Sequence, residues 1–327
     1  MPQLKIRRPA QVIRGGILLV VLALLIRYVI THGSEFRALS SIKLEYLLPV
    51  ILLNSLSLLL SSIRFRLFLT QISHNIPFYT VFKYFTYGRF LNRFLPLGGS
   101  VYRAIMLKKT DGLSYKKYLA SNLAFDWLNM LYSTLLGAVV LVLYDPSLRI
   151  GFFPMLPAFF AGLVVLLLAF PLARAGIRLL RRLFKSPRLR SRVEEASEIV
   201  AAMADALKNR SVFAGSSAII TLILAGSLLS YYLLFRSIGV DTDFVILLVY
   251  LIVLRFLKVF RLTPANLGIR EFLLGFLTYS MGTGTADGIL VALLMRLAML
   301  LVQGVLSIGM FAAERIGRAS DGEASSQ

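Results

Sequence analysis

Long runs of apolar residues, each close to the length of a bilayer crossing, constrain this chain more than any other feature of its sequence. A membrane-spanning helix needs about 20 mostly apolar residues. Eight stretches approach that requirement, the sixth and seventh of them short: residues 15–30, 46–63, 119–144, 152–173, 212–235, 244–254, 272–286 and 289–313. The sequence therefore predicts an all-α, polytopic integral membrane protein with about eight transmembrane helices.

The composition supports a membrane protein and excludes several other classes. Apolar residues make up 57% of the chain and charged residues 16%, whereas a soluble domain has about 25% charged residues. This balance excludes a soluble enzyme, a disordered chain and a fibrous repeat. With no cysteine and only two histidines, His32 and His74, we expect no metal site and no cofactor. Residues 1–315 are expected to form a single transmembrane domain, followed by a short polar, disordered tail at 316–327.

The basic residues predict the orientation in the membrane. The chain has 36 Lys and Arg against 16 Asp and Glu. They cluster before the first apolar run, at 64–117, at 174–210 and after the last run, while the alternate loops are nearly neutral. By the positive-inside rule, both termini face the cytoplasm of a multi-pass cell-membrane protein. The net charge of +20 therefore comes mainly from basic loops that set the orientation in the membrane, and we expect no nucleic-acid partner.

An amphipathic stretch at 190–209 predicts a helix on the cytoplasmic surface.

The segment Phe78 to Gly99 is long enough to span a membrane but carries charged and helix-breaking residues. Arg89 and Arg93 are four residues apart, so they share one helix face with Asn92 close by. Pro96 lacks an N–H and should end the helix, and the glycines that follow allow a turn. We interpret the segment as a broken or re-entrant helix, which needs protein or water around its irregular backbone. The alternative is an amphipathic helix that lies on the membrane within a cytoplasmic linker.

A second segment repeats this pattern about half a chain later. Residues 89–103 read RFLNRFLPLGGSVYR, and residues 255–271 read RFLKVFRLTPANLGIRE. Both copies begin with Arg-Phe-Leu, continue through a Pro and Gly turn, and reach a further Arg. Paired interrupted segments in two halves of a chain indicate the binding site of a transporter. The charge count places both copies against the cytoplasm, so the sequence does not identify the repeat as inverted.

Several ionisable residues lie at membrane depth. A lone charge at the bilayer centre costs about 2.5–3.5 kcal/mol, so such residues should face an interior and find partners. They are Arg89, Arg93, Arg255, Lys258, Arg270 and Arg296 against Asp126 and Glu271. The surplus of guanidinium groups suits phosphate, which arginine binds through two parallel hydrogen bonds. The alternative is a set of buried ion pairs that only hold helices together.

Four segments resemble a known family. GRFLNRFLPLGGSVYRAIML, NLAFDWLN, LTPANLGIREFLL and LLMRLAMLLVQG are similar to the membrane domain of lysylphosphatidylglycerol synthases, a family that includes stand-alone flippase-like proteins. The resemblance covers residues 10–315 and does not extend to the soluble aminoacyl-transfer domain of the full synthase, so we expect that this chain does not make the lysyl-lipid itself. It implies a lipid translocator, not an enzyme, that moves an anionic, modified or polyprenyl-linked lipid between leaflets. It also implies family positions at Asn92, Pro96, Gly99, Arg103, Asp126, Pro264, Gly268, Glu271 and Arg296. Ser100 departs from the pattern, because relatives often have an acid after this glycine.

We expect one basic interior site for the headgroup of a membrane lipid that is anionic or contains phosphate. Its predicted residues are Arg89, Asn92, Arg93, Pro96, Gly99, Arg103, Asp126, Pro264, Gly268, Arg270, Glu271 and Arg296. A lipid-modifying enzyme is a further expected partner.

Two other functions stay open. One is a membrane-embedded transferase that uses a polyprenyl-phosphate-linked donor, with Asp126 or Glu271 as its acid or base. The other is a non-transporting partner of a lipid synthase.

Overall fold

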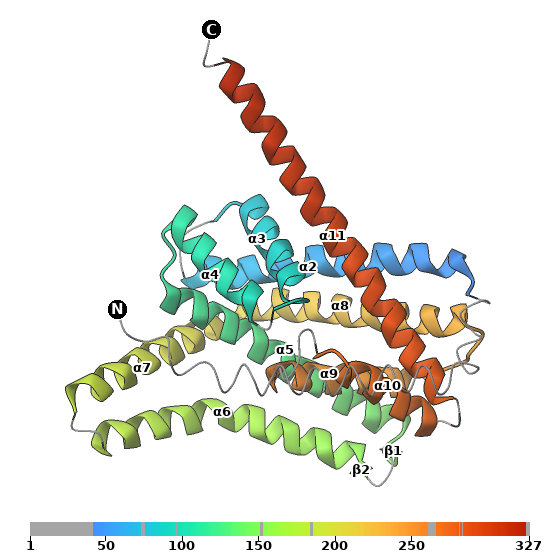
Figure 1. Ribbon diagram of the computed structural model, residues 1–327. Coiled ribbons are helices and arrows are strands. Elements are labelled where there is room, and N and C mark those ends of the chain that lie inside the picture. The colour runs from blue at the N-terminus through green and yellow to red at the C-terminus, as the bar shows by residue number, and fades with distance from the viewer. Residues whose placement is uncertain are drawn as a thin grey trace.

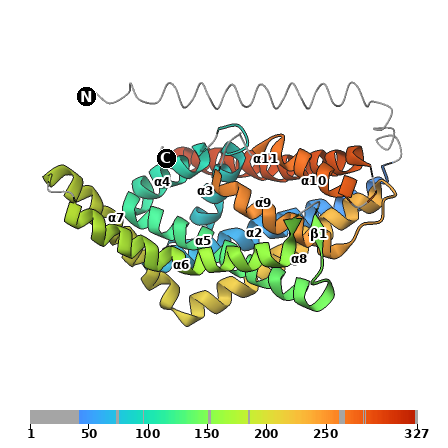
Figure 2. The same cartoon turned by 90° about the horizontal axis from the view of Figure 1, so that it is seen from below.

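The computed structural model is a bundle of helices of very different lengths (Figure 1). It describes residues 42–72, 76–95, 97–150, 153–183, 186–260, 266–280, 282 and 284–324. The elements are η2 (Leu44–Tyr46), α2 (Leu47–Ile72), α3 (Phe78–Leu91), α4 (Gly98–Asp111), α5 (Tyr115–Tyr144), β1 (Arg149–Ile150), β2 (Phe153–Pro154), α6 (Met155–Leu183), α7 (Pro187–Lys208), α8 (Arg210–Ser237), α9 (Phe244–Phe260), α10 (Ile269–Ser280) and α11 (Thr285–Ala324). In the view from below, α2, α5 and α9 lie between α11 and α6 (Figure 2).

Five helices in the described part of the chain are long and apolar enough to cross a membrane. They are η2 with α2, α5, α6, α8 and the Thr285–Glu314 part of α11, which confirms the predicted fold class. The predicted span at 15–30 lies outside the described residues. The predicted span at 272–286 is divided, because α10 ends at Ser280 and α11 begins at Thr285. With 12 residues, α10 is about 18 Å long, well short of the roughly 30 Å hydrocarbon core.

Helices α2 and α8 lie side by side and run in opposite directions (Figure 1). At one end of the pair, the Lys43 N–H donates to the Ser237 carbonyl at 3.1 Å. At the other end, Asn209 Nδ2 donates to Gln71 Oε1 at 2.9 Å. We name these ends of the bundle the Ser237 end and the Gln71 end. They give a reference for every other helix.

Helices α3 and α4 form a hairpin that enters the bundle from the Gln71 end and returns to it. Arg66, near the end of α2, donates from Nε to the carbonyl of Ile76 at 2.9 Å, just before α3 begins. Each helix has 14 residues and is about 21 Å long, too short to cross the bilayer. Val81, Tyr84 and Phe85 are buried in the bundle. The segment is therefore a hairpin packed within protein, and no amphipathic helix lies apart on the surface here.

The predicted break in this segment is confirmed. α3 ends at Leu91, a turn follows, and α4 begins at Gly98. Leu97 precedes α4 with a φ of 65°, a left-handed conformation that reverses the chain at some energetic cost to a leucine. Pro96 lies outside the described residues. The helix therefore stops before Pro96 rather than at it, because in a continued helix the ring of Pro96 would clash with the carbonyl of Asn92, the residue four before it.

Helices α9 and α10 form a second hairpin, which enters from the Ser237 end. α9 begins at Phe244, soon after α8 ends, and it runs antiparallel to α5. Ile252 of α9 contacts Gly137 of α5, and the later Arg255 reaches the earlier Ser133. The two hairpins thus enter from opposite ends, and the expectation that both copies face the cytoplasm is wrong. That expectation took residues 244–254 for a full crossing of the membrane, whereas they belong to α9, one arm of this hairpin.

The two halves of the chain repeat one arrangement of four helices in inverted orientation. A long helix, two short helices and a second long helix follow one another in α2–α5 and again in α8–α11. The offset of 166 residues between the two sequence copies also relates Phe78, where α3 begins, to Phe244, where α9 begins. Because α2 and α8 are antiparallel, the repeat is inverted, as in many secondary transporters. Each hairpin packs against the last helix of the other half, α3 on α11 and α9 on α5.

Two predicted peripheral segments differ in how closely they match the structure. The predicted surface helix at 190–209 corresponds to α7, where Glu198 accepts a hydrogen bond from Lys116 at 3.0 Å beside the start of α5. α11 continues to Ala324, where the sequence predicts a disordered tail from residue 316. This stretch contains Gly317 and Gly322, which are poor helix formers. Its helical conformation is therefore a continuation of the long apolar helix before it, since extending a helix costs much less than starting one.

The first hairpin closes through two glycines. A Cβ atom on Gly99 would overlap the carbonyl oxygen of Gly88, and one on Gly88 would lie 2.8 Å from the carbonyl oxygen of Gly99. Such close approach of two backbones is how small residues pack membrane helices. No residue with a side chain fits at either position without moving α3 away from α4.

Replacing Gly99 tests this packing. We expect Gly99→Ala to lower the free energy of unfolding by about 1–3 kcal/mol, because overpacking forces the backbone to shift. The matched control is Gly176→Ala on α6, where a Cβ meets nothing within 4 Å and which should be neutral or slightly stabilising. Thermal unfolding in detergent checks both. Equal melting temperatures for Gly99→Ala and the wild type would contradict the close packing.

Candidate functional site

The tip of the first hairpin is held against α11 by Arg93. Its Nε donates to Gln303 Oε1 at 3.1 Å, and its Nη2 lies 3.1 Å from the sulfur of Met299. Asn92, one residue earlier, accepts the N–H of Gly99 on its Oδ1 at 2.9 Å. Asn92 therefore satisfies an otherwise unpaired donor in the first turn of α4, a capping role. Arg93 carries its positive charge into the interior with one neutral oxygen and one thioether as partners.

Glu271 organises the start of α10 and neutralises Arg296. It is the third residue of that helix and fully buried, and its Oε2 accepts the N–H of Gly268 at 2.7 Å. This is the second half of a capping box, in which the third helical residue reaches back to the residue before the helix. Its Oε1 accepts Arg296 Nη2 at 2.7 Å and Nε at 2.8 Å. Its negative charge also acts on Arg270, so this one carboxylate serves two arginines.

In each hairpin, the arginine that follows the turn lies beside an aromatic residue of the preceding long helix. Arg270 Nη2 donates to the hydroxyl of Tyr231 at 2.8 Å, and that ring meets Tyr250 edge-on at 5.2 Å. In the other half, the guanidinium of Arg103 lies 5.2 Å from the ring centre of Phe65, which the 166-residue offset relates to Tyr231. Cation–π contact of this kind stabilises a guanidinium without neutralising it. Both hairpins therefore present a charged arginine to the interior.

Two interior arginines and one asparagine are missing from the predicted site. Arg64 is 1% exposed, and its Nη1 donates to Asn129 Oδ1 at 2.9 Å. Arg255 donates from Nη1 to the same oxygen at 2.7 Å and to Ser133 Oγ at 2.5 Å. The guanidinium of Arg64 also stacks 3.6 Å above the ring of Phe125. The sequence could have indicated Arg64, since it lies one residue after an apolar run, but the run was taken to end there.

Asp126 is the second acid of the interior, and it lies half-buried on α5. It accepts a hydrogen bond on Oδ2 from Asn122 Nδ2 at 3.2 Å. Its negative charge acts on Arg64 and on Arg89, whose guanidinium lies 5.0 Å from the ring centre of Phe85. Asp126 thus belongs to the arginine group beside the first hairpin.

The described interior side chains carry many more positive charges than negative ones. The tips of both hairpins contact the same stretch of α11, because Arg93 reaches Met299 and Gln303 while Glu271 reaches Arg296. The charges of Arg89, Arg270 and Arg296 act on Arg93. The arginine cluster, as we name it, comprises Arg64, Arg89, Arg93, Arg103, Arg255, Arg270 and Arg296, with Asp126 and Glu271 as its acids. Of the predicted site, Pro96 and Pro264 lie outside the described residues. An interior with surplus guanidinium groups can bind an anion through charge-assisted hydrogen bonds.

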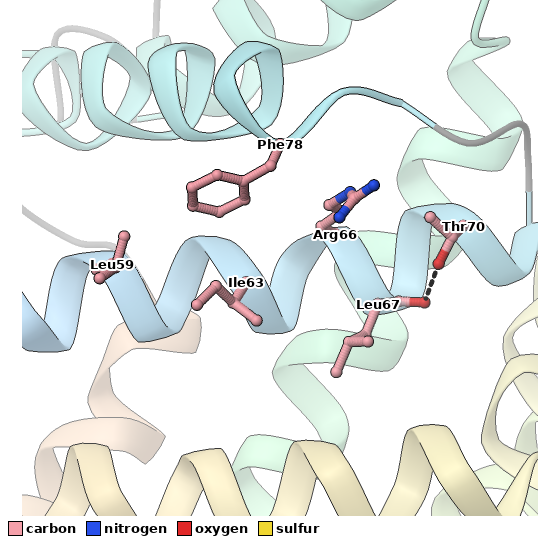
Figure 3. A pocket seen from close by; sticks show the side chains of 6 residues that line it. All are labelled: Leu59, Ile63, Arg66, Leu67, Thr70 and Phe78. Carbon is pink, nitrogen blue, oxygen red and sulfur yellow. Dashed lines mark hydrogen bonds between the residues drawn. The ribbon is translucent and has the colours of Figure 1, made fainter.

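Two pockets on the outside of the bundle are separate from this cluster. The larger, about 650 Å³, lies between α2 and the start of α3 and contains Arg66 (Figure 3). The smaller, about 180 Å³, is an apolar groove between α5 and α6. Neither is lined by a residue of the predicted site.

The fold and the cluster together define a multi-pass α-helical membrane protein whose interior carries surplus positive charge. A family model described as lysylphosphatidylglycerol synthase TM region matches residues 11–307, most of the chain. The chain therefore belongs to this family, as its motifs suggest. No curated protein and no solved structure matches the chain.

The Glu271–Arg296 pair gives a direct test of how the interior charges are held. We expect Glu271→Gln to destabilise the protein by about 3–5 kcal/mol, because it leaves the buried Arg296 without its counter-charge. Glutamine can still accept the N–H of Gly268, so the helix cap is retained and only the charge is removed. The double variant Glu271→Gln, Arg296→Gln should be more stable than the sum of the single effects. Additive losses of melting temperature would show that the two side chains are not coupled.

Proposed function

We propose that the protein moves a membrane lipid with an anionic, phosphate-containing headgroup between leaflets, and that the headgroup passes the arginine cluster. The observation that carries this proposal is the excess of seven interior arginines over two acids. One of those acids, Glu271, is already paired with Arg296. The membership in a family of lipid-synthase membrane domains supports a lipid as the substrate.

Burial explains why such a cluster suits a phosphate headgroup. Moving an ionised group from water into hydrocarbon is prohibitive unless charged partners and hydrogen bonds replace its hydration. Arg93 and Arg270 have only neutral hydrogen-bond partners, Gln303 and Tyr231. A phosphate between them would supply the missing negative charge, while the lipid tails stay in the bilayer.

The two inverted hairpins give the lipid headgroup a route to the arginine cluster from each side of the membrane. The α3–α4 hairpin enters from the Gln71 end and the α9–α10 hairpin from the Ser237 end, so each separates the cluster from one face. Displacement of one hairpin at a time would expose the cluster to one side of the membrane. The basic loops orient the Gln71 end toward the cytoplasm, with both termini on that side of the cell membrane.

Neutralising one arginine from each hairpin tests this proposal. We expect Arg93→Gln and Arg270→Gln each to slow the translocation of phosphatidylglycerol by at least about tenfold, since a hydrogen bond to a charged group contributes about 1.5–3 kcal/mol. Arg192→Gln, on the exposed face of α7, is the matched control and should leave the rate unchanged. The measurement is a leaflet-resolved assay with purified protein in liposomes without nucleotide.

Three outcomes separate the candidate functions. Unchanged transport in folded Arg93→Gln and Arg270→Gln would mean that the headgroup passes elsewhere. Chemical conversion of a polyprenyl-phosphate-linked lipid in the same liposomes would favour a transferase. Wild-type protein that neither moves nor converts any lipid would favour a partner subunit of a synthase.

A further inference from the structure

An open groove lies on the outside of the bundle where the first hairpin begins. It has a volume of about 650 Å³ and is lined by Leu59, Ile63, Arg66, Leu67, Thr70 and Phe78. Figure 3 shows the ring of Phe78 and the guanidinium of Arg66 together in the space between α2 and α3. The groove continues a lipid-facing stripe of α2, in which Leu48, Leu52 and Leu56 are at least half exposed. Hydrocarbon therefore reaches the groove from the bilayer.

The inverted repeat shows that the same place in the other half is filled. The 166-residue offset relates Arg66 to Tyr232 and Phe78 to Phe244. Tyr232 stacks on Phe244 with ring centres 4.5 Å apart and an angle of 23°. Arg236, which corresponds to Thr70, then donates from Nε to the Tyr232 hydroxyl at 2.9 Å. An aromatic ring thus packs between α8 and α9 at this position, where the first half has Arg66 instead.

We propose that a phospholipid takes the place of that ring, with one acyl chain in the groove and its phosphate at Arg66. The groove is polar at one end only. Leu59, Ile63, Leu67 and Phe78 are apolar, whereas Arg66 and Thr70 lie in the last two turns of α2. From Thr70 to Leu59 the helix rises about 16 Å, enough for a long stretch of acyl chain.

Charge and position favour a phosphate over an uncharged headgroup. Arg66 donates from Nε to the Ile76 carbonyl, which fixes the plane of its guanidinium in the last two turns of α2, near the Gln71 end of the bundle. A guanidinium in this setting binds phosphate with geometric specificity. The site is separate from the arginine cluster, so the inference stands whether or not the protein translocates lipids. A phospholipid bound in the groove would hold α3 against α2, just as Tyr232 holds α9 against α8.

The decisive experiment maps where a lipid tail lies. The full chain, purified in maltoside micelles, is exposed to phosphatidylglycerol that carries a photoactivatable diazirine near the end of one acyl chain. Mass spectrometry then locates the labelled peptides. We expect labelling of the α2 segment around Leu59 and Ile63. A diacylglycerol probe with the same chain should label it at least about tenfold less, and excess inorganic phosphate should not compete.

Three variants make the result specific to the groove. Arg66→Tyr copies the second half and should reduce labelling of this segment at least about tenfold. Ile63→Trp fills the apolar part with Arg66 intact and should do the same. Arg210→Tyr places the same substitution at an exposed site on α8 near Gln71 and should leave labelling unchanged. Melting temperatures and gel filtration establish that each variant is folded.

The labelling pattern also identifies the ways in which the proposal fails. Labelling of the α2 segment in Arg66→Tyr within twofold of the wild type would overturn it. Equal labelling by diacylglycerol would show that Arg66 does not select a phosphate. To separate this site from the arginine cluster, the labelling is repeated in the Arg93→Gln, Arg270→Gln background. There the α2 labelling should persist, even if labelling elsewhere is lost.

Discussion

The structure depends on how guanidinium groups are accommodated inside a membrane protein. Each buried arginine must receive acceptors or aromatic faces, because unpaired charge in a region of low dielectric is costly. Arg255 of α9 uses Asn129 and Ser133 on α5, and Arg93 at the first hairpin uses Gln303 on α11. These contacts join each hairpin to the last helix of the opposite half. The polar contacts therefore hold the two halves of the repeat together.

The inverted repeat explains why these partners come from opposite halves. A hairpin of two short helices cannot cross the bilayer, so its tip ends within the bundle and needs protein around its irregular backbone. The antiparallel pair α2 and α8 brings the two tips toward each other from opposite ends. The halves have also diverged. Glu271 neutralises Arg296 in the second half, while the 166-residue offset relates Glu271 to Ile105 in the first. The offset also relates Arg296 to Met130, so the whole ion pair is specific to the second half.

Sequence reasoning could predict the helices but only part of the interior. The apolar runs and the Arg89-to-Gly99 pattern indicated the spans and the broken helix, because both signals are local. Arg64 was missed because α2 continues to Ile72, beyond the last uninterrupted apolar residue. The orientation of the second hairpin was missed because the short apolar run at 244–254 looks the same in the sequence whether it crosses the membrane or forms one arm of a hairpin. Tyr231 was missed as a partner of Arg270 because nothing in either local sequence connects them.

The central claim is that arginines from two opposed hairpins form one anion site. The most direct measurement is a cryo-EM map of the full chain in nanodiscs that contain phosphatidylglycerol. The account predicts headgroup density at the hairpin tips, with a phosphate within hydrogen-bonding distance of both Arg93 and Arg270. A map in which the two tips are separated by acyl chains or packed apolar side chains, with no headgroup density between these arginines, would contradict it.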